Sequence, residues 1–386
     1  MSDNAQFNVA IVSGICVKHD AISASVRDDA FALTEAFGFH TRIFTYKNEF
    51  SDLDAVQVND ASDIVFDPYF LSCDLIIYHF GIYYELFNSI FLGNGRAPQV
   101  VRYHNLTPRE FLPQSEWDLF ERSSAQLHNM NAADAVWAVS DTNRQHIVET
   151  GIVPAQRVAV IPLCVGDGQR SGGLANKTAL PLRLLFVGRF VRSKGLLDLL
   201  RVIRNLKEKN ISFVLRLVGD PTFTDPGFIR SLRQTTRDLG VQQEVVFVGR
   251  VTDDELTVEY NNAHILVIPS YHEGFCKPVI EAMRHGCIPI TYDSTNLEFV
   301  ARGLSRTVKT GDLGALTDAI AGLAPSVTSA VRKPKSAVIA VDRGPLSLHE
   351  YEAAVDEVLV EYGSPSVSQH LRKAAHGLIS RLVCNA

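Results

Sequence analysis

Short apolar runs alternate along this chain with segments whose apolar residues recur every three or four positions. The runs are typical of buried strands, and the segments, such as residues 28–37 and 115–132, are typical of amphipathic helices. Regular alternation of the two predicts an α/β protein with doubly wound parallel sheets. We predict strands over residues 7–14, 40–46, 73–80, 98–105, 134–140 and 157–162, and again over 182–188, 211–219, 244–249, 264–270 and 287–292.

A glycine-rich, polar segment at residues 165–181 interrupts the alternation and has the composition of a linker. The chain has 386 residues, which is long for one hydrophobic core. We therefore predict a first domain over residues 1–164, a second over residues 182–345, and a cleft across which the two face each other. Residues 346–386 read as C-terminal helices, the last of them basic and amphipathic.

Composition narrows the class of protein. Hydrophobic residues make up 46% and charged residues 21% of the chain, and its formal net charge is −6, so nucleic acid is not an expected partner. The six cysteines lack metal-ligand spacing, which favours buried thiols in a reducing compartment. The first residues do not read as a signal peptide, and no apolar run is long enough to span a bilayer, so a cytoplasmic protein is expected.

The most informative stretch runs from Ile265 to Gly286 and reads as a buried strand, a tight loop and a short helix. Glu273 is expected in the loop and Glu281 in the first turn of the helix. Both carboxylates would then lie at the carboxyl end of a parallel sheet, where such sheets bind ligands. Backbone N–H groups around Gly274 to Lys277, beside a helix N-terminus, suit a phosphate. The alternative is that Glu281 only complements the helix dipole and Glu273 is solvated.

The spacing Glu273-Gly-Phe-x-x-Pro-Val-x-Glu281-Ala-Met, followed by Gly286-x-x-Pro289, resembles the signature of retaining glycosyltransferases of family 4, also called glycosyltransferase group 1. The resemblance implies the GT-B fold, with two Rossmann-like domains. It places Glu273 on hydroxyls of the transferred sugar and Glu281 on the ribose of the donor, with Gly274, Phe275, Cys276 and Lys277 in the donor loop. Cys276-Lys277 stand where many members have Gly-Leu, which leaves the identity of the donor sugar open.

A second stretch, Gly188-Arg189-x(4)-Lys194-Gly195, precedes a predicted helix at residues 196–209. Cations just before a helix N-terminus are disfavoured by the dipole, and a diphosphate would offset that cost. The family resemblance includes this pattern and implies that Arg189 and Lys194 bind the donor phosphates. The alternative is a pair of solvated cations.

Residues 246–256 are similar to the family segment that contacts the nucleotide base, which makes Arg250 and Val251 candidates for the base pocket. The same pattern also fits a strand followed by a helix capped at Thr252, with Glu255 three residues later. The two interpretations are compatible.

In the first domain, His104 and Asn105 follow a predicted strand and precede Pro108, so they are expected at the carboxyl end of the sheet. The resemblance makes His104 a candidate for binding the donor sugar or orienting the acceptor hydroxyl. His79 ends a neighbouring strand and is predicted to be a packing or supporting residue. Gly14 is a weaker candidate near the diphosphate, because many family members carry a glycine pair there.

The resemblance implies transfer of a hexose-like sugar from a nucleoside diphosphate sugar to an acceptor hydroxyl, with retention. Arg189, Lys194 and the helix N-terminus at Pro278 could stabilise the leaving diphosphate, so neither a metal nor another cofactor is expected. No G-x-G-x-x-G motif follows the first strand of either domain, which disfavours a nicotinamide dehydrogenase. Cys276 as a nucleophile lacks an identifiable base.

The expected acceptor is a glycan or a lipid-linked glycan in polysaccharide biosynthesis. In GT-B proteins the C-terminal helices commonly cross back onto the first domain, which is the expectation for residues 346–386. The alternative for the basic terminal helix is peripheral docking on the inner face of an anionic membrane. The alternative functions are a non-catalytic sugar-nucleotide-binding partner subunit and a GT-B sugar-nucleotide epimerase.

Overall fold

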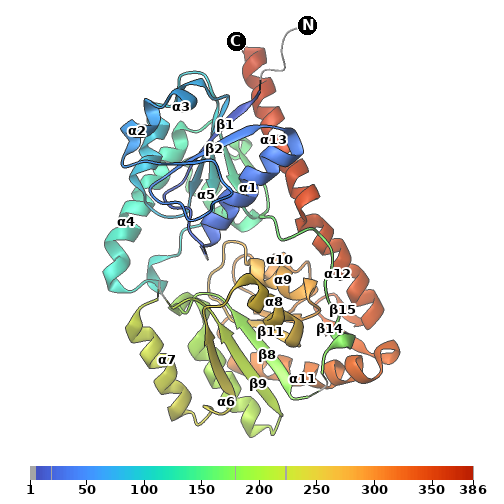
Figure 1. Cartoon of the computed structure of the whole chain (residues 1–386). Coiled ribbons are helices and arrows are strands. Elements are labelled where there is room, and N and C mark those ends of the chain that lie inside the picture. The colour runs from blue at the N-terminus through green and yellow to red at the C-terminus, as the bar shows by residue number, and fades with distance from the viewer. Residues whose placement is uncertain (1–5, 19, 179, 222–223, 386) are drawn as a thin grey trace. The chain divides into compact units, whose positions relative to one another are not determined.

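The computed structural model describes residues 6–18, 20–178, 180–221 and 224–385. The chain divides into two compact units. Unit 1 comprises the chain up to Cys164 together with the C-terminal segment from Ser364, and unit 2 comprises Val165–Gly363. Figure 1 labels the elements, and each unit is described by itself.

Unit 1 contains, in its described residues, a parallel sheet of seven strands in the order β3-β2-β1-β4-β5-β6-β7. Consecutive residues of the central strands enter different cores: Val9 and Ile11 pack with one hydrophobic cluster and Ala10 and Val12 with the other. Both faces of the sheet are therefore covered, as a doubly wound fold requires. The strands are β1 (Asn8–Val12), β2 (His40–Thr45), β3 (Ala55–Gln57), β4 (Leu75–Phe80), β5 (Gln99–Tyr103), β6 (Ala135–Ala138) and β7 (Val158–Val160).

Helices of different origin cover the two faces of this sheet. The α1 helix and the C-terminal α13 supply Val26, Leu33 and Leu371 to one face, while α2, α3 and α5 contribute Ile64, Phe70 and Ile147 to the other. The helices are α1 (Ala21–Phe37), α2 (Ala61–Val65), α3 (Pro68–Ser72), α4 (Trp117–Gln126), α5 (Asp141–Glu149) and α13 (Ser364–Asn385); short 3-10 turns are η1 (Glu85–Phe91), η2 (Arg109–Phe111), η3 (Gln114–Glu116), η4 (Leu127–Ala132) and η5 (Ala155–Arg157).

Unit 2 has a parallel sheet with six described strands in the order β10-β9-β8-β11-β12-β13, and a separate β14-β15 hairpin. All residues of β11 and β12 are buried, so this sheet is also covered on both faces. The strands are β8 (Leu182–Val187), β9 (Phe213–Val218), β10 (Val245–Gly249), β11 (Ile265–Ile268), β12 (Ile288–Tyr292), β13 (Arg306–Val308), β14 (Val338–Val341) and β15 (Gly344–Ser347).

Unit 2 carries the helices α6 (Leu196–Glu208), α7 (Pro226–Asp238), α8 (Asp253–Asn262), α9 (Lys277–Arg284), α10 (Leu297–Val300), α11 (Leu313–Arg332) and α12 (Leu348–Tyr362), with 3-10 turns η6 (Leu174–Asn176), η7 (Arg192–Lys194) and η8 (Pro334–Ser336). The predicted fold class of two doubly wound domains is confirmed, and a strand occurs at each predicted position. The cleft between the domains stays a prediction. The strands β3, β13, β14 and β15 were not predicted, and each of them has only three or four residues.

The segment expected as a linker is packed into unit 2. Ser171 N and Gly172 N donate to Arg284 O at 3.0 and 3.2 Å. Lys177, which is 8% exposed, donates from Nζ to Tyr260 O at 3.0 Å. A Cβ on Gly286 would lie 2.7 Å from Gly173 C, so glycines here permit close approach of two backbones. In this segment a high glycine content marks tight packing instead of a flexible connection.

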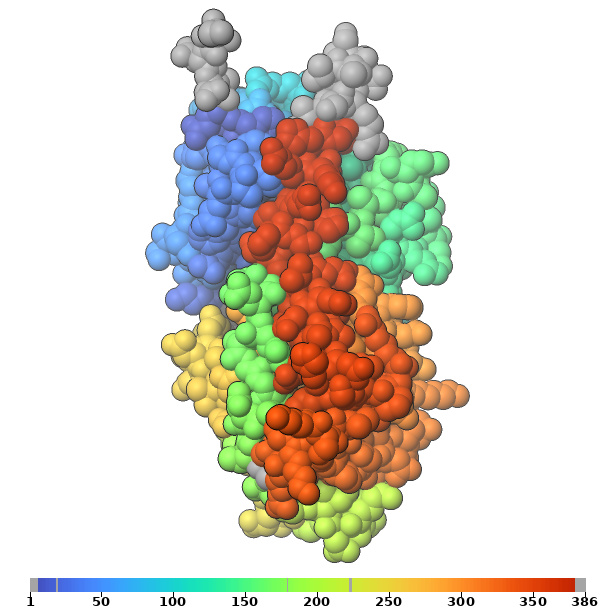
Figure 2. All heavy atoms as spheres, turned by 90° about the vertical axis from the view of Figure 1, so that its right-hand side faces the viewer, coloured from blue at the N-terminus to red at the C-terminus, as the bar shows by residue number. Residues whose placement is uncertain are grey.

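The C-terminal segment that belongs to unit 1 begins at Ser364, later than the predicted residue 346. The α12 helix belongs to unit 2, and α13 belongs to unit 1, where it lies against α1 (Figure 2). Val367, Leu371, Ala375 and Leu378 of α13 are buried in the unit 1 core. The described apolar face of this basic helix is therefore used in packing. No described helix is long and apolar enough to cross a membrane.

Candidate active site

The loop between β11 and α9 carries the predicted glutamate pair. The α9 helix begins at Lys277, so Glu281 lies one turn beyond the first turn in which it was expected, and the first turn of α9 contains no acidic residue. The interpretation of Glu281 as a simple complement to the helix dipole is therefore wrong. Cys276 precedes the helix with φ 75°, in the left-handed region that favours glycine. This explains physically why a glycine is common at its position in the resembling family.

Both the side chain and the backbone of Glu273 hold it in place at the start of this loop. Its Oε1 lies 2.6 Å from Lys194 Nζ and accepts a 2.9 Å hydrogen bond from Ser270 Oγ. Its backbone N donates to Thr295 Oγ1 at 2.9 Å, and the same hydroxyl donates to Glu273 O. The side chains of Lys194 and Glu273 are 17% and 10% exposed, so the pair is partly desolvated yet reachable. Two residues predicted from separate motifs thus meet in one site.

The loop that carries Lys194 is tied to the end of β11. Tyr271 N donates to Ser193 O at 2.7 Å, and Tyr271 Oη donates to Asp198 Oδ2 at 2.5 Å. Gly195 has φ 65°, and a Cβ on it would lie 1.9 Å from Pro269 O. Only glycine allows this approach, so Gly195 sets the position of Lys194 relative to Glu273.

Arg189 follows Gly188 at the end of β8 and is exposed. Its side chain makes no hydrogen bond or ion pair with the parts of the chain that the structure describes. The neighbouring Arg192 lies over the ring of Phe228, with Cζ 5.4 Å from the ring centre. The exposed guanidinium of Arg189 is therefore available to an anion.

Glu281 is hydrogen-bonded to a buried tyrosine, Tyr260, which the sequence analysis did not identify. Tyr260 Oη, on α8, donates to Glu281 Oε2 at 2.7 Å. Burial is the largest influence on Glu281 and raises its pKa, while the Tyr260 hydrogen bond and the Lys277 charge act in the opposite direction. The Tyr260 ring stacks on His285 with centres 5.6 Å apart. Tyr260 lies on α8 and Glu281 on α9, and the sequence around Tyr260 contains no motif that would have identified it.

Residues 246–256, predicted to contact the nucleotide base, contain the predicted strand and the predicted helix cap. Thr252 caps α8, and its capping box with Glu255 is present. Arg250 is exposed, with Nε 3.5 Å from Asp220 Oδ2, and Val251 is partly buried beside it. Three adjacent strands end in glycines at this edge, and a Cβ on Gly219 would lie 2.1 Å from Gly188 O. Glycine at position 219 therefore lets two neighbouring strand ends approach each other closely. The base contact itself stays a prediction.

Phe275 and Cys276, two residues predicted in the donor loop, have buried side chains. Phe275 is buried, with its ring centre 5.4 Å from that of Tyr362, so its side chain serves the core of unit 2. Burial, and then the charge of Glu273, raise the pKa of the Cys276 thiol well above its usual value. A thiol of this kind is protonated at neutral pH and is not a nucleophile. Gly274 and Lys277 are partly exposed in the same loop.

The candidates in unit 1 lie at the carboxyl ends of its central strands. Gly14 follows β1, where its O accepts from Tyr46 N at 3.0 Å and a Cβ would be 3.3 Å from Tyr84 Cβ. His104 follows β5 and is partly exposed. Its Nε2 lies 3.0 Å from Nδ1 of His79, at the end of β4. Their approach to the unit 2 site stays a prediction.

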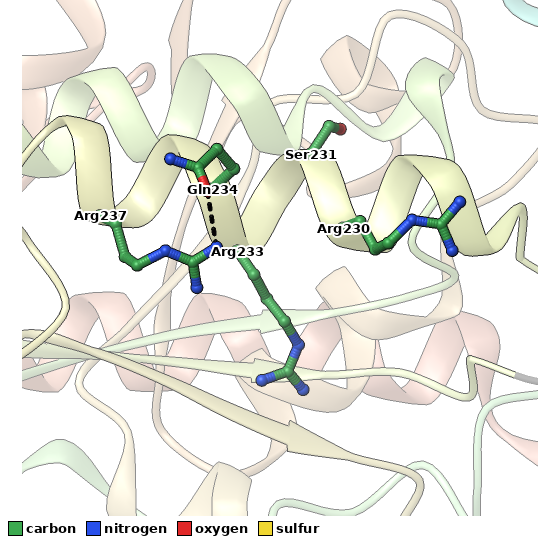
Figure 3. Close-up of a pocket in the computed structure, with 5 residues that line it drawn as sticks. All are labelled: Arg230, Ser231, Arg233, Gln234 and Arg237. Carbon is green, nitrogen blue, oxygen red and sulfur yellow. Dashed lines mark hydrogen bonds between the residues drawn. The ribbon is translucent and has the colours of Figure 1, made fainter.

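The described residues offer no second candidate among metal-binding clusters or the cavity on α7. Within the described residues, no group of three or more His, Cys, Asp or Glu side chains could hold a metal ion. A shallow cavity of about 410 Å³ lies on the outer side of α7, lined by Arg230, Ser231, Arg233, Gln234 and Arg237 (Figure 3). It contains none of the predicted site residues. Metal independence stays a prediction.

Comparisons with known proteins bear on the family and the fold of this chain. Residues 181–325 match the model of the family "Glycosyl transferases group 1", which confirms the resemblance over the second domain. The serotype-specific mannosyltransferase WbdA of Escherichia coli is 27% identical over 184 residues, which are 45% of this chain but only 22% of that relative. The chain therefore spans about a fifth of the length of this relative.

Solved structures match nearly the whole chain. The sucrose-phosphate synthase of Thermosynechococcus elongatus has a TM-score of 0.73 at 19% identity, with 97% of this chain and 100% of that chain covered. HepE of Anabaena, solved in complex with UDP-glucose, has a TM-score of 0.69 at 14% identity and covers 99% of this chain and 100% of that chain. At such identities the likeness concerns the fold, and it confirms the predicted GT-B class.

Proposed function

We propose that this chain is a retaining glycosyltransferase that moves a hexose-like sugar from a nucleoside diphosphate sugar to an acceptor hydroxyl. The observation that carries the proposal is the 2.6 Å pair of Lys194 and Glu273 beside the exposed Arg189. The group 1 match over residues 181–325 supports it. The name of the mannosyltransferase WbdA supports a hexose, and the UDP-glucose complex of HepE supports a nucleotide sugar as donor.

Donor binding follows from the charges and hydrogen-bonding groups at this edge of unit 2. Arg189, Lys194 and the backbone N–H groups at the start of α9 would hold the diphosphate. When a phosphate oxygen pairs with Lys194, Glu273 becomes available to accept hydroxyls of the sugar. Glu281 would accept ribose hydroxyls while Tyr260 holds its Oε2. Arg250, Val251 and Gly14 complete the proposed donor contacts.

The chemistry needs stabilisation of charge on the leaving diphosphate. Two cations and a helix N-terminus in a partly desolvated site supply it, so we propose no metal and no other cofactor. Positive charge that develops on the sugar lies near the Glu273 carboxylate. We propose retention through front-face attack by the acceptor hydroxyl, with His104 orienting the acceptor or the sugar.

We propose a glycan or lipid-linked glycan as the acceptor, in polysaccharide biosynthesis in the cytoplasm. A lipid-linked acceptor would bring the enzyme to the inner face of the membrane as a peripheral protein. Two other functions make different predictions. A non-catalytic partner subunit would bind the nucleotide sugar without releasing nucleotide, and an epimerase would release or invert the sugar without an acceptor.

The test is thermal stabilisation by UDP, GDP, ADP and dTDP and by their common sugar conjugates. We compare the wild type with Glu281→Gln, which keeps the side-chain shape and removes the charge, and with Glu208→Gln, an exposed carboxylate of α6 that pairs with Arg204. One base should stabilise the wild type and the Glu208 variant, and this shift should shrink in the Glu281 variant. Equal shifts in all three proteins, or no shift with any nucleotide, would reject the site.

A further inference from the structure

Three consecutive polar residues shortly after β12 lie against the loop between β11 and α9. Ser294 Oγ donates to Ser270 O, and Asn296 Nδ2 donates to Phe275 O at 2.9 Å. The two side chains belong to residues that are only 8% and 5% exposed. They hold the loop near its start and near its end. The residue between them, Thr295, binds the part of the loop in the middle.

The hydroxyl of Thr295 binds the backbone of Glu273 on both sides of its Cα. Glu273 N donates to Thr295 Oγ1, and Thr295 Oγ1 donates to Glu273 O, each at 2.9 Å. A hydroxyl can do both at once, because it has one O–H donor and two acceptor lone pairs. The two bonds tie the peptide groups before and after the Cα to one atom, which restricts φ and ψ of Glu273. They therefore limit the directions in which its carboxylate can point.

This restriction matters because the contacts of the carboxylate itself would change when a donor binds. Glu273 Oε1 lies 2.6 Å from Lys194 Nζ and 2.9 Å from Ser270 Oγ in the structure. A diphosphate that pairs with Lys194 takes the stronger of these two partners, since Lys194 carries the charge. The bonds from Thr295 do not involve the carboxylate and are kept.

Thr295 adopts a backbone conformation that its own side chain disfavours. Its φ is 48°, in the left-handed region, where a β-branched residue is a genuine outlier. The other non-glycine residues with positive φ in the described chain are asparagine, cysteine and arginine, and none of these is β-branched. Glycine would adopt this φ without strain. Strain of this kind persists where the surroundings impose it, and it gathers at functional sites. What glycine could not supply at this position is the hydroxyl on Glu273.

We propose that Thr295 is a positioning residue, whose hydroxyl fixes the backbone of Glu273 and so keeps its carboxylate directed at the donor sugar after the diphosphate has taken Lys194. The two hydrogen bonds and the strained φ lie within unit 2. The effect on turnover rests on the proposed function.

The first measurement is hydrogen exchange at the amide of Glu273, resolved to that residue by ¹⁵N NMR. Thr295→Ser keeps the hydroxyl, whereas Thr295→Gly removes the hydroxyl together with the strain. The amide should be protected in the wild type and in Thr295→Ser, and it should exchange about tenfold faster in Thr295→Gly. Asn210→Gly is the matched control: Asn210 also has a positive φ, 57°, and is exposed after α6, so exchange at Glu273 should not change.

The second measurement is turnover, which separates positioning from simple stabilisation. Thr295→Gly should lower kcat about tenfold, with the thermal stabilisation by nucleotide unchanged, while Thr295→Ser and Asn210→Gly should stay within about threefold of the wild type. Because Thr295 acts through Glu273, Thr295→Gly should lower kcat no further in a Glu273→Gln background. A residue that only stabilises the loop would lower kcat by the same factor in both backgrounds.

Unchanged exchange at Glu273 in Thr295→Gly would overturn the inference, as would equal factors in the two backgrounds. If Thr295→Gly does not fold, Thr295→Ala replaces it, with the same expected and the same overturning results. Faster exchange at Glu273 in the variant, together with a wild type that turns over no nucleotide sugar, would reject the proposed function and support the backbone clamp alone.

Discussion

Lys194 Nζ and Glu273 Oε1 lie 2.6 Å apart, although 78 residues separate them along the chain. One comes from the loop after β8 and the other from the loop after β11, two strands that are neighbours in the sheet. Each was predicted to contact the donor, one through a phosphate and the other through sugar hydroxyls. Their pairing means that a donor would have to compete with Glu273 for Lys194, which links phosphate binding to release of the carboxylate.

Glu273→Gln tests the role of this carboxylate. The amide keeps the shape, but it neither attracts Lys194 nor offsets positive charge on the sugar. We expect kcat to fall about a hundredfold, while the affinity for the nucleoside diphosphate does not fall, because Arg189 and a Lys194 released from the carboxylate remain to bind it. Steady-state kinetics and calorimetric titration check this. An unchanged kcat in a folded variant would remove Glu273 from the reaction.

Gly195→Ala tests how the Lys194 loop is positioned. The new Cβ would meet Pro269 O and the residue would have a positive φ, so we expect about 3 kcal/mol of destabilisation in the free energy of unfolding. Gly240→Ala is the matched control in the same unit, since Gly240 has φ 66° and only a flexible Arg204 atom at 3.8 Å, and it should cost about 1 kcal/mol. Urea unfolding of both variants measures the difference. Equal losses would contradict a specific role for the close approach.

Tyr260→Phe tests the support of Glu281. Loss of the hydroxyl removes a hydrogen bond that lowers the pKa of Glu281, so this pKa should rise further. An ionised carboxylate accepts hydrogen bonds from ribose hydroxyls more strongly than a protonated one does. Nucleotide affinity should therefore fall as the pH decreases through this pKa, and the fall should begin at a higher pH in the variant. Titrations between about pH 5 and pH 8 measure it.

Tyr351→Phe is the control for this substitution. Tyr351 is buried on α12, and its hydroxyl has no hydrogen-bond partner within the described residues. Its removal should leave both the affinity and its pH dependence unchanged. Identical pH profiles for the wild type and Tyr260→Phe would show that the hydroxyl does not act on Glu281.

Cys276→Ser separates the proposed reaction from covalent catalysis. Since the Cys276 thiol has a raised pKa and is buried, it should not react in the folded protein. Activity of the serine variant should stay within about threefold of the wild type, because serine keeps the size of the side chain and the same backbone conformation. A complete loss of turnover with normal nucleotide binding would point to a nucleophile.

Leu371→Ala tests whether α13 is part of unit 1. Leu371 is fully buried among α1 and the sheet, so its truncation should cost about 3 kcal/mol in the free energy of unfolding. Lys373→Ala, on the exposed side of the same helix, should cost little. Denaturant unfolding checks both. A negligible effect of Leu371→Ala would leave the apolar face of α13 available for a membrane.

The sequence predicted the order of strands along the chain because buried parallel strands are near-continuous apolar runs, as in Ile265–Ile268. It also predicted Lys194 and Glu273, whose motifs have fixed spacing. It did not reveal Tyr260 as a supporting residue, because its partner Glu281 lies on another helix and the two follow no local period. The segment at residues 165–181 shows a different limit: the same glycines can mark a linker or close backbone packing, and only the tertiary contacts distinguish the two.

The measurement that tests the central claim most directly is ¹H NMR of a nucleotide sugar, chosen by thermal stabilisation, incubated with the protein and simple hexoside acceptors. The account predicts nucleotide release together with a glycoside, or a slowly hydrolysed sugar, that first appears with the anomeric configuration of the donor. Glu273→Gln should slow the appearance of this signal about a hundredfold while still binding the nucleotide. Binding without any release, or a product of inverted configuration, would contradict the assignment of this chain as a retaining glycosyltransferase.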